Sequence, residues 1–592
     1  MKAINGGRST ESECSVTRRF SPLAALPLLL PALLMGGCAT TTATDAGQQM
    51  SIERNVLGDA PFGAYLAGRV AGQLNEMDAA ALYYSEALAS DPTNQTLLER
   101  SFSTSLSNGR FSEALPLAQR LMETGDAPSL APLLLVLDNV KAERYGPALE
   151  LAQAMPATGF NTLVGPLVQA WVLQGLGRTD EALTALAKLD SSASFASFQH
   201  FHQALILARA GRVDAAEQAF QTTLTVPGGA TPRTLLAYGR FLATTGHKDD
   251  AVALYDDYIK ALPGNPTVEA ARASVLAGQD VPVVASPAEG LSDVFFDTAQ
   301  ALDRNGTRSA AIIYAQLANF LMPESDEGRM LLGNLYEASG QDMAAVQAFA
   351  SVSERSPLHW EAQRDYATMQ YRMGNADEAR RILESMREKN PDDLTVAITL
   401  ADVYRRQGEP DKARQIYDAI IGSINEPKEN HWSLYYTRGT TFEELGQWDK
   451  AEADLLMALE LSPDQPVVLN YLGYSWVVRG ENLDRALTMI RKAVELRPND
   501  GNIVDSLGWA LYKLGRYDEA VEQLERAVLL RPEVPEINEH LGDAYWRVGR
   551  ILEARFQWSH AIDLGGDGTN IDILEAKRDT QPGGDPFAHD GD

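Results

Sequence analysis

The sequence predicts an all-α protein made of about fourteen copies of one two-helix unit, stacked as a superhelical solenoid. A motif ending in alanine recurs with a period of mostly 34 residues, and glycine and proline punctuate the copies at matching places. One helix pair buries too little apolar surface to fold alone, so neighbouring pairs must share a core. The recurring alanines are Ala80, Ala114, Ala148, Ala182, Ala216, Ala251, Ala311, Ala345, Ala379, Ala413, Ala451, Ala486, Ala520 and Ala554.

Each residue type in the repeated unit has a mechanical role. In the copy around Ala520, Gly508 and Ala520 are small where two helix backbones approach each other. Gly515 closes the first helix, where a positive φ is convenient, and Pro532 stops the second. Asp518 is predicted to cap the second helix by accepting backbone N–H groups. The same place is held by Asp78, Asp180, Asp214, Asp249, Asp377, Asp411, Asp449 and Asp484.

Two copies carry a more specific pattern. Leu332-Gly333-x-x-Tyr336 is followed by Ala345, and Leu541-Gly542-x-x-Tyr545 is followed by Ala554. This pattern resembles the tetratricopeptide repeat (TPR), a 34-residue helix-turn-helix unit. The resemblance implies an all-α TPR solenoid with about 14 repeats.

The spacing of the repeats divides the chain. The longest interval between alanines is 60 residues and contains the proline-containing segment 278–290, which has no helical period. We therefore predict an N-terminal array of about six repeats over 61–277, a linker over 278–290, and a C-terminal array of about eight repeats over 291–565. Residues 566–592 are predicted to form an acidic tail.

The N-terminal segment has the features of an export signal. Arg18 and Arg19 precede the apolar run from Leu23 to Met35, which is about half the length that a helix needs to cross a bilayer. The ending Leu34-Met35-Gly36-Gly37-Cys38 resembles the lipobox of bacterial lipoproteins, which implies a signal peptide over 1–37 and a lipid on Cys38. The alternative is an ordinary secretory peptide with an incidental cysteine. Residues 38–60 then form the lipidated end and a flexible polar tether.

Composition and the absence of known motifs argue against several classes of function. A net charge of −29 disfavours nucleic acid as a partner. Phosphate-binding glycine loops, metal-ligand spacings and nucleophile motifs were not found, so we predict no enzyme activity, no cofactor, no metal and no small-molecule substrate. The alternative from another class is an envelope enzyme that uses carboxylates indistinguishable from those on exposed helix faces.

The resemblance also indicates where partners bind. In TPR proteins the second, fifth, ninth, twelfth and thirteenth positions of each first helix face the concave groove. Aromatic and hydrogen-bonding residues at such positions are typical of binding hot spots. Trp509, Tyr512 and Trp546 have an alternative role, packing on the first helix of the neighbouring repeat. The candidate groove residues of the last three repeats are Asn470, Tyr474, Asn502, Asp505, Trp509, Tyr512, Lys513, Glu539, Asp543, Trp546 and Arg547.

These features together suggest a function. Because acidic and aromatic residues dominate the candidate groove, we expect protein or peptide partners that are neutral, basic or apolar. Ala39 after Cys38 implies an outer-membrane location facing the periplasm. Lipobox, tether and repeats resemble the outer-membrane lipoproteins that act as adaptors for periplasmic carboxyl-terminal processing proteases and their cell-wall hydrolase substrates. The alternative is a TPR lipoprotein that assists assembly of a secretin, a pilus or a surface-polymer export system.

Overall fold

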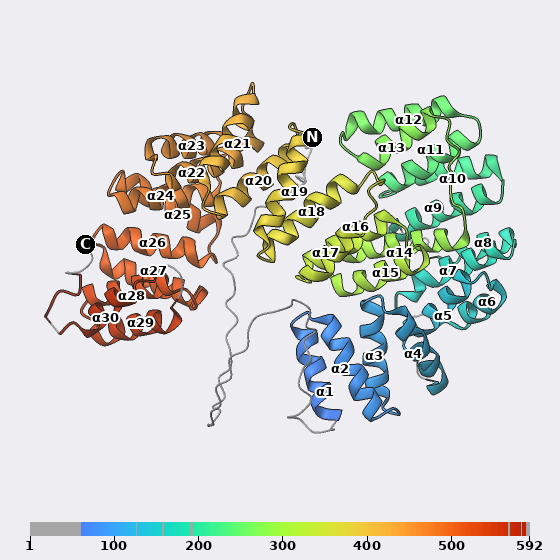
Figure 1. The fold of residues 1–592 in the computed structure, drawn as a ribbon, viewed down its shortest axis with the longest axis horizontal. Coiled ribbons are helices and arrows are strands. Elements are labelled where there is room, and N and C mark those ends of the chain that lie inside the picture. Colours follow the sequence, from blue (N-terminus) through green and yellow to red (C-terminus); the bar gives the residue numbers. More distant parts are fainter. Residues whose placement is uncertain are drawn as a thin grey trace, which may run out of the picture. The chain divides into compact units, whose positions relative to one another are not determined.

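Every regular element in the described part of the chain is helical (Figure 1). It contains thirty α-helices and one short 3-10 turn, Glu429–His431. The predicted signal peptide, Cys38 and the tether lie outside the described residues. The computed structural model describes residues 61–125, 127–156, 159–189, 193–565, 569–581 and 583–587.

Twenty-eight of these helices form fourteen successive pairs. The first six pairs are α1 (Pro61–Gln73) with α2 (Met77–Ser90), α3 (Gln95–Ser107) with α4 (Phe111–Thr124), α5 (Leu130–Lys141) with α6 (Tyr145–Ala154), α7 (Asn161–Gly175) with α8 (Thr179–Leu186), α9 (Ala193–Arg209) with α10 (Val213–Thr225), and α11 (Pro232–Thr244) with α12 (Lys248–Ala261).

The other eight pairs follow a single unpaired helix, α13 (Pro266–Leu276), and a last helix, α30 (Ile571–Asp579), comes after them. The eight pairs are α14 (Pro287–Arg304) with α15 (Arg308–Leu321), α16 (Asp326–Ala338) with α17 (Asp342–Ala350), α18 (His359–Arg372) with α19 (Ala376–Lys389), α20 (Leu394–Arg406) with α21 (Pro410–Ser423), α22 (Trp432–Glu444) with α23 (Trp448–Leu461), α24 (Pro466–Arg479) with α25 (Leu483–Leu496), α26 (Gly501–Lys513) with α27 (Tyr517–Leu530), and α28 (Pro535–Arg547) with α29 (Ile551–Leu564).

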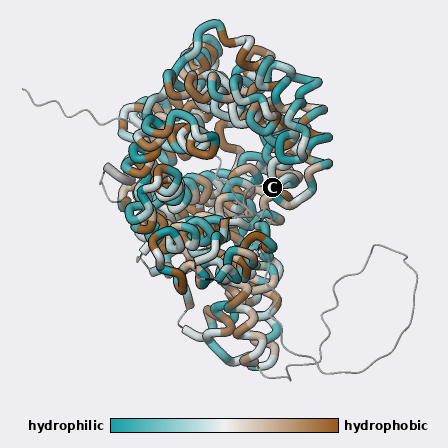
Figure 2. The backbone as a smooth tube through the Cα atoms, turned by 90° about the vertical axis from the view of Figure 1, so that its left-hand side faces the viewer, coloured by the Kyte–Doolittle hydropathy of each residue, from teal (hydrophilic) through white to brown (hydrophobic). Residues whose placement is uncertain are grey.

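The recurring alanines mark the closest approach within each pair. All fourteen lie on the second helix of a pair, and each is 0% exposed. Figure 2 shows hydrophobic and hydrophilic stretches alternating along the chain, as expected for helices that bury one face. The prediction of an all-α solenoid with about fourteen two-helix units is confirmed.

The glycines of the repeated unit do what the pattern predicts. A Cβ atom on Gly508 would lie 2.5 Å from Cγ of Leu524, so only glycine allows α26 to approach α27 this closely. Gly515 has a φ of 74°, and the next residue, Arg516, donates its backbone N–H to the carbonyl of Leu511. This αL turn ends α26 and reverses the chain within two residues.

The predicted capping role of the second-helix aspartates is wrong. Because the helix starts directly after the turn glycine, Arg516 occupies the N-cap of α27 and Asp518 lies one position inside its first turn, without a capping hydrogen bond. The other eight aspartates of the set occupy the same place in their helices. There a carboxylate still interacts favourably with the helix dipole. Asp180 also pairs with Arg212 of the next unit at 2.7 Å.

The junction between the arrays differs from a simple linker. Residues 277–286 connect α13 to α14, and α14 begins at Pro287, four residues before the predicted start at 291. Ser286 caps α14 by accepting the backbone N–H of Glu289 at 3.1 Å. The helix then packs against α5, α7 and α9, and α15 packs against α3 and α5 (Figure 1). The seventh pair therefore lies on the first helices of the N-terminal array.

The hydrophobic core extends across the contact between the two arrays. One connected cluster of buried side chains runs from Ala87 to Met369 and includes residues of both arrays. Separate clusters serve the remaining pairs, from Ala367 to Ile420 and from Tyr435 to Leu574. The N-terminal array and the start of the C-terminal array thus depend on each other for burial.

Candidate functional site

The groove positions of the middle N-terminal repeats are apolar and covered. When the repeats are aligned on their alanines, the residues of α5 and α7 that correspond to Asp505 and Trp509 are Leu133, Leu137, Leu167 and Trp171, and all four side chains are fully buried. Trp171 is in contact with α14, where a Cβ atom on Gly290 would lie 2.3 Å from its ring. A partner polypeptide has no access to these positions, because helices of the same chain occupy them.

Polar contacts fix the same docking at its edges. The ammonium of Lys141 on α5 donates to the carbonyl oxygen of Phe320 on α15 at 2.6 Å. The ring of Phe320 also packs on Phe111, with 4.4 Å between centroids. On α7, Trp171 donates its indole N–H to Nδ1 of His202 at 3.2 Å, and burial lowers the pKa of that histidine to about 3. His202 is therefore a neutral core residue.

In the C-terminal repeats the structure joins several predicted groove residues into one cluster. Asp505 on α26 is hydrogen-bonded to Nδ1 of His540 on α28 at 3.0 Å. The imidazole of His540 stacks on Trp509, with 4.0 Å between centroids and 14° between planes. Trp509 also stacks on Tyr512 and lies under the ammonium of Lys513 at 4.7 Å. Trp509 thus packs on the neighbouring first helix while its ring stays partly exposed.

The electrostatics of this cluster keep His540 charged at neutral pH. Burial disfavours the imidazolium, but the carboxylate of Asp505, with Glu536 and Asp543, outweighs burial and raises the pKa of His540 to about 9. The sequence analysis missed His540 because it occupies the sixth position of its helix, which was not counted as facing the groove. Its sequence neighbours Asn538 and Glu539 are also polar, so no local pattern marked His540 as a buried residue.

The predicted residues of α24 lie beside this cluster. The hydroxyl of Tyr474 donates to Oε1 of Glu536 on α28 at 3.3 Å. Burial together with Glu536 and Asp505 raises the pKa of Tyr474, so its hydroxyl stays a donor. Asn470 is half-buried, and its Oδ1 atom is buried without a hydrogen-bond partner. Asn502, at the start of α26, is exposed.

The predicted residues of α28 are largely engaged by the C-terminal helix. The ammonium of Lys577 on α30 donates to Glu539 at 2.8 Å and to Asp543 at 3.0 Å. Asp543 also accepts the indole N–H of Trp558 at 2.9 Å. Burial raises the pKa of Asp543 to about 6, with the nearby lysine opposing the rise. Lys577 was not predicted, and it holds α30 over the end of the last repeat.

The remaining two predicted residues lie at the other end of α28. Trp546 packs at 5.6 Å between ring centroids on Trp558 in the core of the last pair. The exposed guanidinium of Arg547 donates to the hydroxyl of Tyr512 at 3.2 Å and lies 4.3 Å from the ring centroid of Phe587. The eleven predicted residues therefore lie on α24, α26 and α28, but Asp505, Tyr512 and Asp543 among them are buried, and Lys577 of α30 pairs with Glu539 and Asp543.

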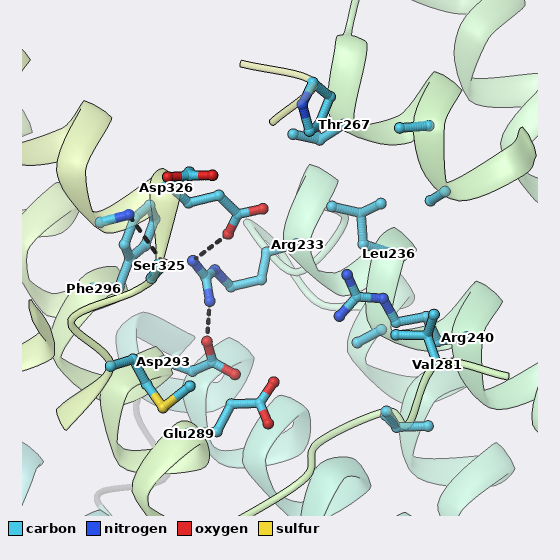
Figure 3. Close-up of a pocket in the computed structure, with 18 of the residues that line it drawn as sticks. Arg233, Leu236, Arg240, Thr267, Val281, Glu289, Asp293, Phe296, Ser325 and Asp326 are labelled. Atoms are coloured by element: carbon cyan, nitrogen blue, oxygen red, sulfur yellow. Dashed lines mark hydrogen bonds and ion pairs between the residues drawn. The ribbon is translucent and has the colours of Figure 1, made fainter. Parts of the chain in front are cut away.

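A cavity of about 470 Å³ is lined by residues of the N-terminal array and of the first helices of the C-terminal array (Figure 3). Its walls come from α11, α13, the 277–286 segment, α14 and α16. Arg233, Leu236 and Arg240 line it from α11, at the second, fifth and ninth positions of that first helix. Phe296 lines it from α14. The sequence analysis did not single out these residues.

The cavity contains an excess of carboxylates. The guanidinium of Arg233 pairs with Asp293 and with Asp297 and Glu327, the last two at 3.4 Å and 3.2 Å, and it lies over the ring of Phe296. Burial raises the pKa of Asp293 to about 7 and that of Asp297 to about 6, although Arg233 opposes the rise. One guanidinium therefore serves three carboxylates, and this wall favours a positively charged ligand over an anion.

The described residues contain no group of three or more His, Cys, Asp or Glu side chains arranged to hold a metal ion. Three groups with strongly shifted pKa values are tied to structural partners: His202 to Trp171, His540 to Asp505, and Asp543 to Lys577. No helix among the described residues is both long and apolar enough to cross a bilayer.

Family profiles match three parts of the chain. Tetratricopeptide repeat profiles match residues 64–94 and the overlapping segments 167–232 and 201–266. A profile described as the C-terminal domain of cilia and flagella-associated protein 70 matches residues 349–572. Helix pairs with small residues at each crossing cover these same segments. The fold of the chain is a tetratricopeptide-repeat solenoid.

Individual relatives match only portions of the chain. A TPR repeat-containing protein of Pseudomonas aeruginosa is 29% identical over 192 residues, which are 32% of this chain and 32% of the relative. A human protein O-mannosyl-transferase is 24% identical over 176 residues, 30% of this chain and 20% of the relative. The chain thus spans about a third and a fifth of the lengths of these two proteins.

Solved structures are also similar to the chain. A tetratricopeptide repeat protein from Parabacteroides merdae shares 18% identity at a TM-score of 0.35, covering 42% of this chain and 96% of its own. The Cut9–Hcn1 hetero-tetramer of the APC/C shares 16% identity at a TM-score of 0.37, covering 87% of this chain and 97% of the matched one.

Proposed function

We propose that this protein is a non-enzymatic scaffold that binds partner polypeptides along the first helices of its C-terminal array. The observation that carries the proposal is the contrast between the two arrays. The groove positions of α5 and α7 are apolar and covered by α14 and α15, whereas α26 presents Asn502, Trp509 and Lys513 at least partly exposed. Repeat solenoids use such concave surfaces for binding.

The charge of the available surface defines the class of partner. On this surface Glu536 of α28 is exposed, whereas Asp505 is paired with His540 and Glu539 with Lys577. The cavity at α11 adds three carboxylates around one guanidinium. A partner segment with basic or apolar side chains complements these groups. An acidic segment is repelled, and the chain as a whole adds a net charge of −29.

The cellular setting of the proposal comes from the N-terminal motif. A lipid on Cys38 would hold the repeats at the periplasmic face of the outer membrane, where the scaffold would bring a processing protease and its cell-wall hydrolase substrates together. Support for this part is the lipobox-like ending at Cys38, the following Ala39 and the likeness of the last three repeats to adaptor lipoproteins. Globomycin, which blocks lipoprotein signal peptidase, should leave unprocessed precursor if the anchor exists.

A matched pair of charge substitutions tests the binding surface. Asn502→Lys adds a positive charge at an exposed groove position of α26, and Glu522→Lys adds a lysine at an exposed position of α27, the second helix of the same pair. With the mature protein as bait in solubilised envelope, we expect Asn502→Lys to lose basic partners that Glu522→Lys retains. Equal recovery with both variants and the unaltered protein would contradict the proposed surface.

A further inference from the structure

The first helix of the array exposes a stripe of apolar side chains. On α1, Phe62, Leu66 and Val70 are 76%, 55% and 53% exposed, and Leu74, just beyond the helix, is 64% exposed. They are spaced four residues apart, so they follow one side of the helix. Scattered surface leucines need no explanation, but an aligned row of four large apolar residues marks an interaction surface.

The stripe is not the face by which α1 packs on its own repeat. That face is formed by Tyr65, Gly68 and Ala71. Gly68 faces Tyr84 of α2, where a Cβ atom would lie 3.1 Å from the ring, and Tyr65 packs on the same ring at 6.0 Å between centroids. Ala71 is buried. The helix therefore has two apolar faces, one satisfied within the repeat and one directed outward.

The two ends of the array differ in whether a further helix covers the terminal repeat. At the C-terminal end, α30 covers the last repeat and Lys577 neutralises the carboxylates of Glu539 and Asp543. At the N-terminal end the described residues provide no comparable helix outside α1. A terminal repeat needs a polar outer face to remain soluble by itself. The apolar stripe of α1 consequently requires a covering surface.

The geometry points to a lipid bilayer as the surface that the α1 stripe contacts. This inference rests on the proposed lipid anchor at Cys38. Twenty-three residues separate Cys38 from Phe62. Even a fully extended chain of this length reaches only about 80 Å. The anchor would therefore limit how far α1 can lie from the bilayer, and α1 is the described helix nearest to Cys38 along the chain.

The polar groups of α1 agree with a membrane surface. Its single charged residue is Arg69, which is exposed and lies next to Val70, and the helix contains no Asp or Glu. Aromatic and aliphatic residues on one face with a basic residue at its border are typical of helices that lie in the interface. Arg69 can extend toward headgroup phosphates while its aliphatic stem stays over the acyl chains.

A single labelled cysteine tests the inference. The only cysteine left after cleavage before residue 38 is the lipidated one, so Leu66→Cys introduces a unique free thiol. We would attach an NBD fluorophore there, in the lipidated full chain, and reconstitute it into vesicles of phosphatidylethanolamine and phosphatidylglycerol. The control is Leu552→Cys on α29, whose native side chain is 79% exposed. We expect a blue shift and a several-fold rise in emission at position 66 only.

If a protein segment rather than a bilayer covers the stripe, the labelling experiment gives a different result. The same label in a non-lipidated Cys38→Ser chain without vesicles should be fully quenched by iodide. Protection there at every protein concentration would assign the stripe to residues 39–60, and protection that grows with concentration would assign it to a second copy; both overturn the inference. The mass of the mature chain tests the anchor separately. Unmodified Cys38 would overturn the anchor and the inference together, whereas lipidated Cys38 with an unshifted label overturns only the inference.

Discussion

Gly290 of α14 lies directly against the indole of Trp171 on α7, so closely that a Cβ atom would come within 2.3 Å of the ring. Trp171 is fully buried and its N–H is held by His202, so the ring has no room to move. This contact joins the first helix of the seventh pair to the fourth repeat. It explains why the two arrays share one core.

Gly290→Ala should therefore loosen the docking of α14. We expect it to lower the free energy of unfolding of the N-terminal part by about 1–3 kcal/mol, because the methyl group overpacks a rigid site. Gly165→Ala on α7 is the matched control, since a Cβ atom there meets nothing within 4 Å. Urea denaturation measures both variants. Equal stability of the two would show that the Gly290 contact does not hold the arrays together.

The salt bridge at the end of the array predicts a second effect. Lys577→Met leaves the buried carboxylate of Asp543 without its cation and should destabilise the contact between α28 and α30 by about 3 kcal/mol. Hydrogen exchange of the α30 amides measures this loss. Lys577→Met combined with Asp543→Asn should recover most of the protection. Lys513→Met, at an exposed lysine, should change it little.

The pair of His540 and Asp505 predicts a pH dependence. A histidine has a pKa of about 6.5 in the unfolded chain, and that of His540 is raised to about 9 in the folded one. Its stabilising contribution is thus complete below pH 6.5 and is lost as the pH rises through 9. The loss should be on the order of 3 kcal/mol.

The measurement is the melting temperature between pH 6 and 10. The unaltered protein should lose stability across this range, and His540→Gln should lose much less of it. His247→Gln, at an exposed histidine, should follow the unaltered protein. Parallel curves for all three proteins would mean that His540 does not carry the charge.

The cavity carboxylate of Asp293 predicts another pH dependence of stability, which comes from an acidic group rather than from a basic one. Asp293 has its pKa raised from 3.8 to about 7, so its folded form binds a proton that the unfolded form releases. Its contribution to stability is present below pH 3.8 and is lost as the pH rises through 7. About a fifth of its side chain remains exposed, so water in the cavity weakens the effect, to on the order of 1 kcal/mol.

Asp293→Asn should remove this dependence. Between pH 5 and 8 the free energy of unfolding of the unaltered protein should fall relative to that of the variant. Asp256→Asn on α12, which removes a half-exposed carboxylate paired with Arg272, is the control and should leave the slope unchanged. A slope that persists in Asp293→Asn would place the titrating group elsewhere.

Much of the fold was predictable because one small residue is required at every helix crossing. The recurring alanines gave the number and the places of the helix pairs, and Gly515 marked the turn that closes a first helix. The role of Asp518 was misjudged by two positions, because Arg516, directly after the turn glycine, is the N-cap of α27. Period and residue size determine pairing, whereas cap geometry depends on the exact turn.

The candidate site was predictable only in part. Aromatic and polar residues at groove positions predict a binding surface on α24, α26 and α28, and the structure brings several of these residues into contact with one another. The docking of α14 into the first array is a tertiary contact between segments more than a hundred residues apart, which no local pattern specifies. Its one signal was the apolar character of groove positions such as Leu133 and Trp171, residues that a solvent-exposed groove would not contain.

The central claim is that partners bind the first helices of the C-terminal array. Site-specific photocrosslinking in intact cells tests it most directly, with benzoylphenylalanine placed at exposed Asn502 on α26 or at exposed Glu522 on α27. We predict a discrete protein adduct from position 502 and none from position 522. Adducts from position 522 alone, or from neither position, would contradict the claim.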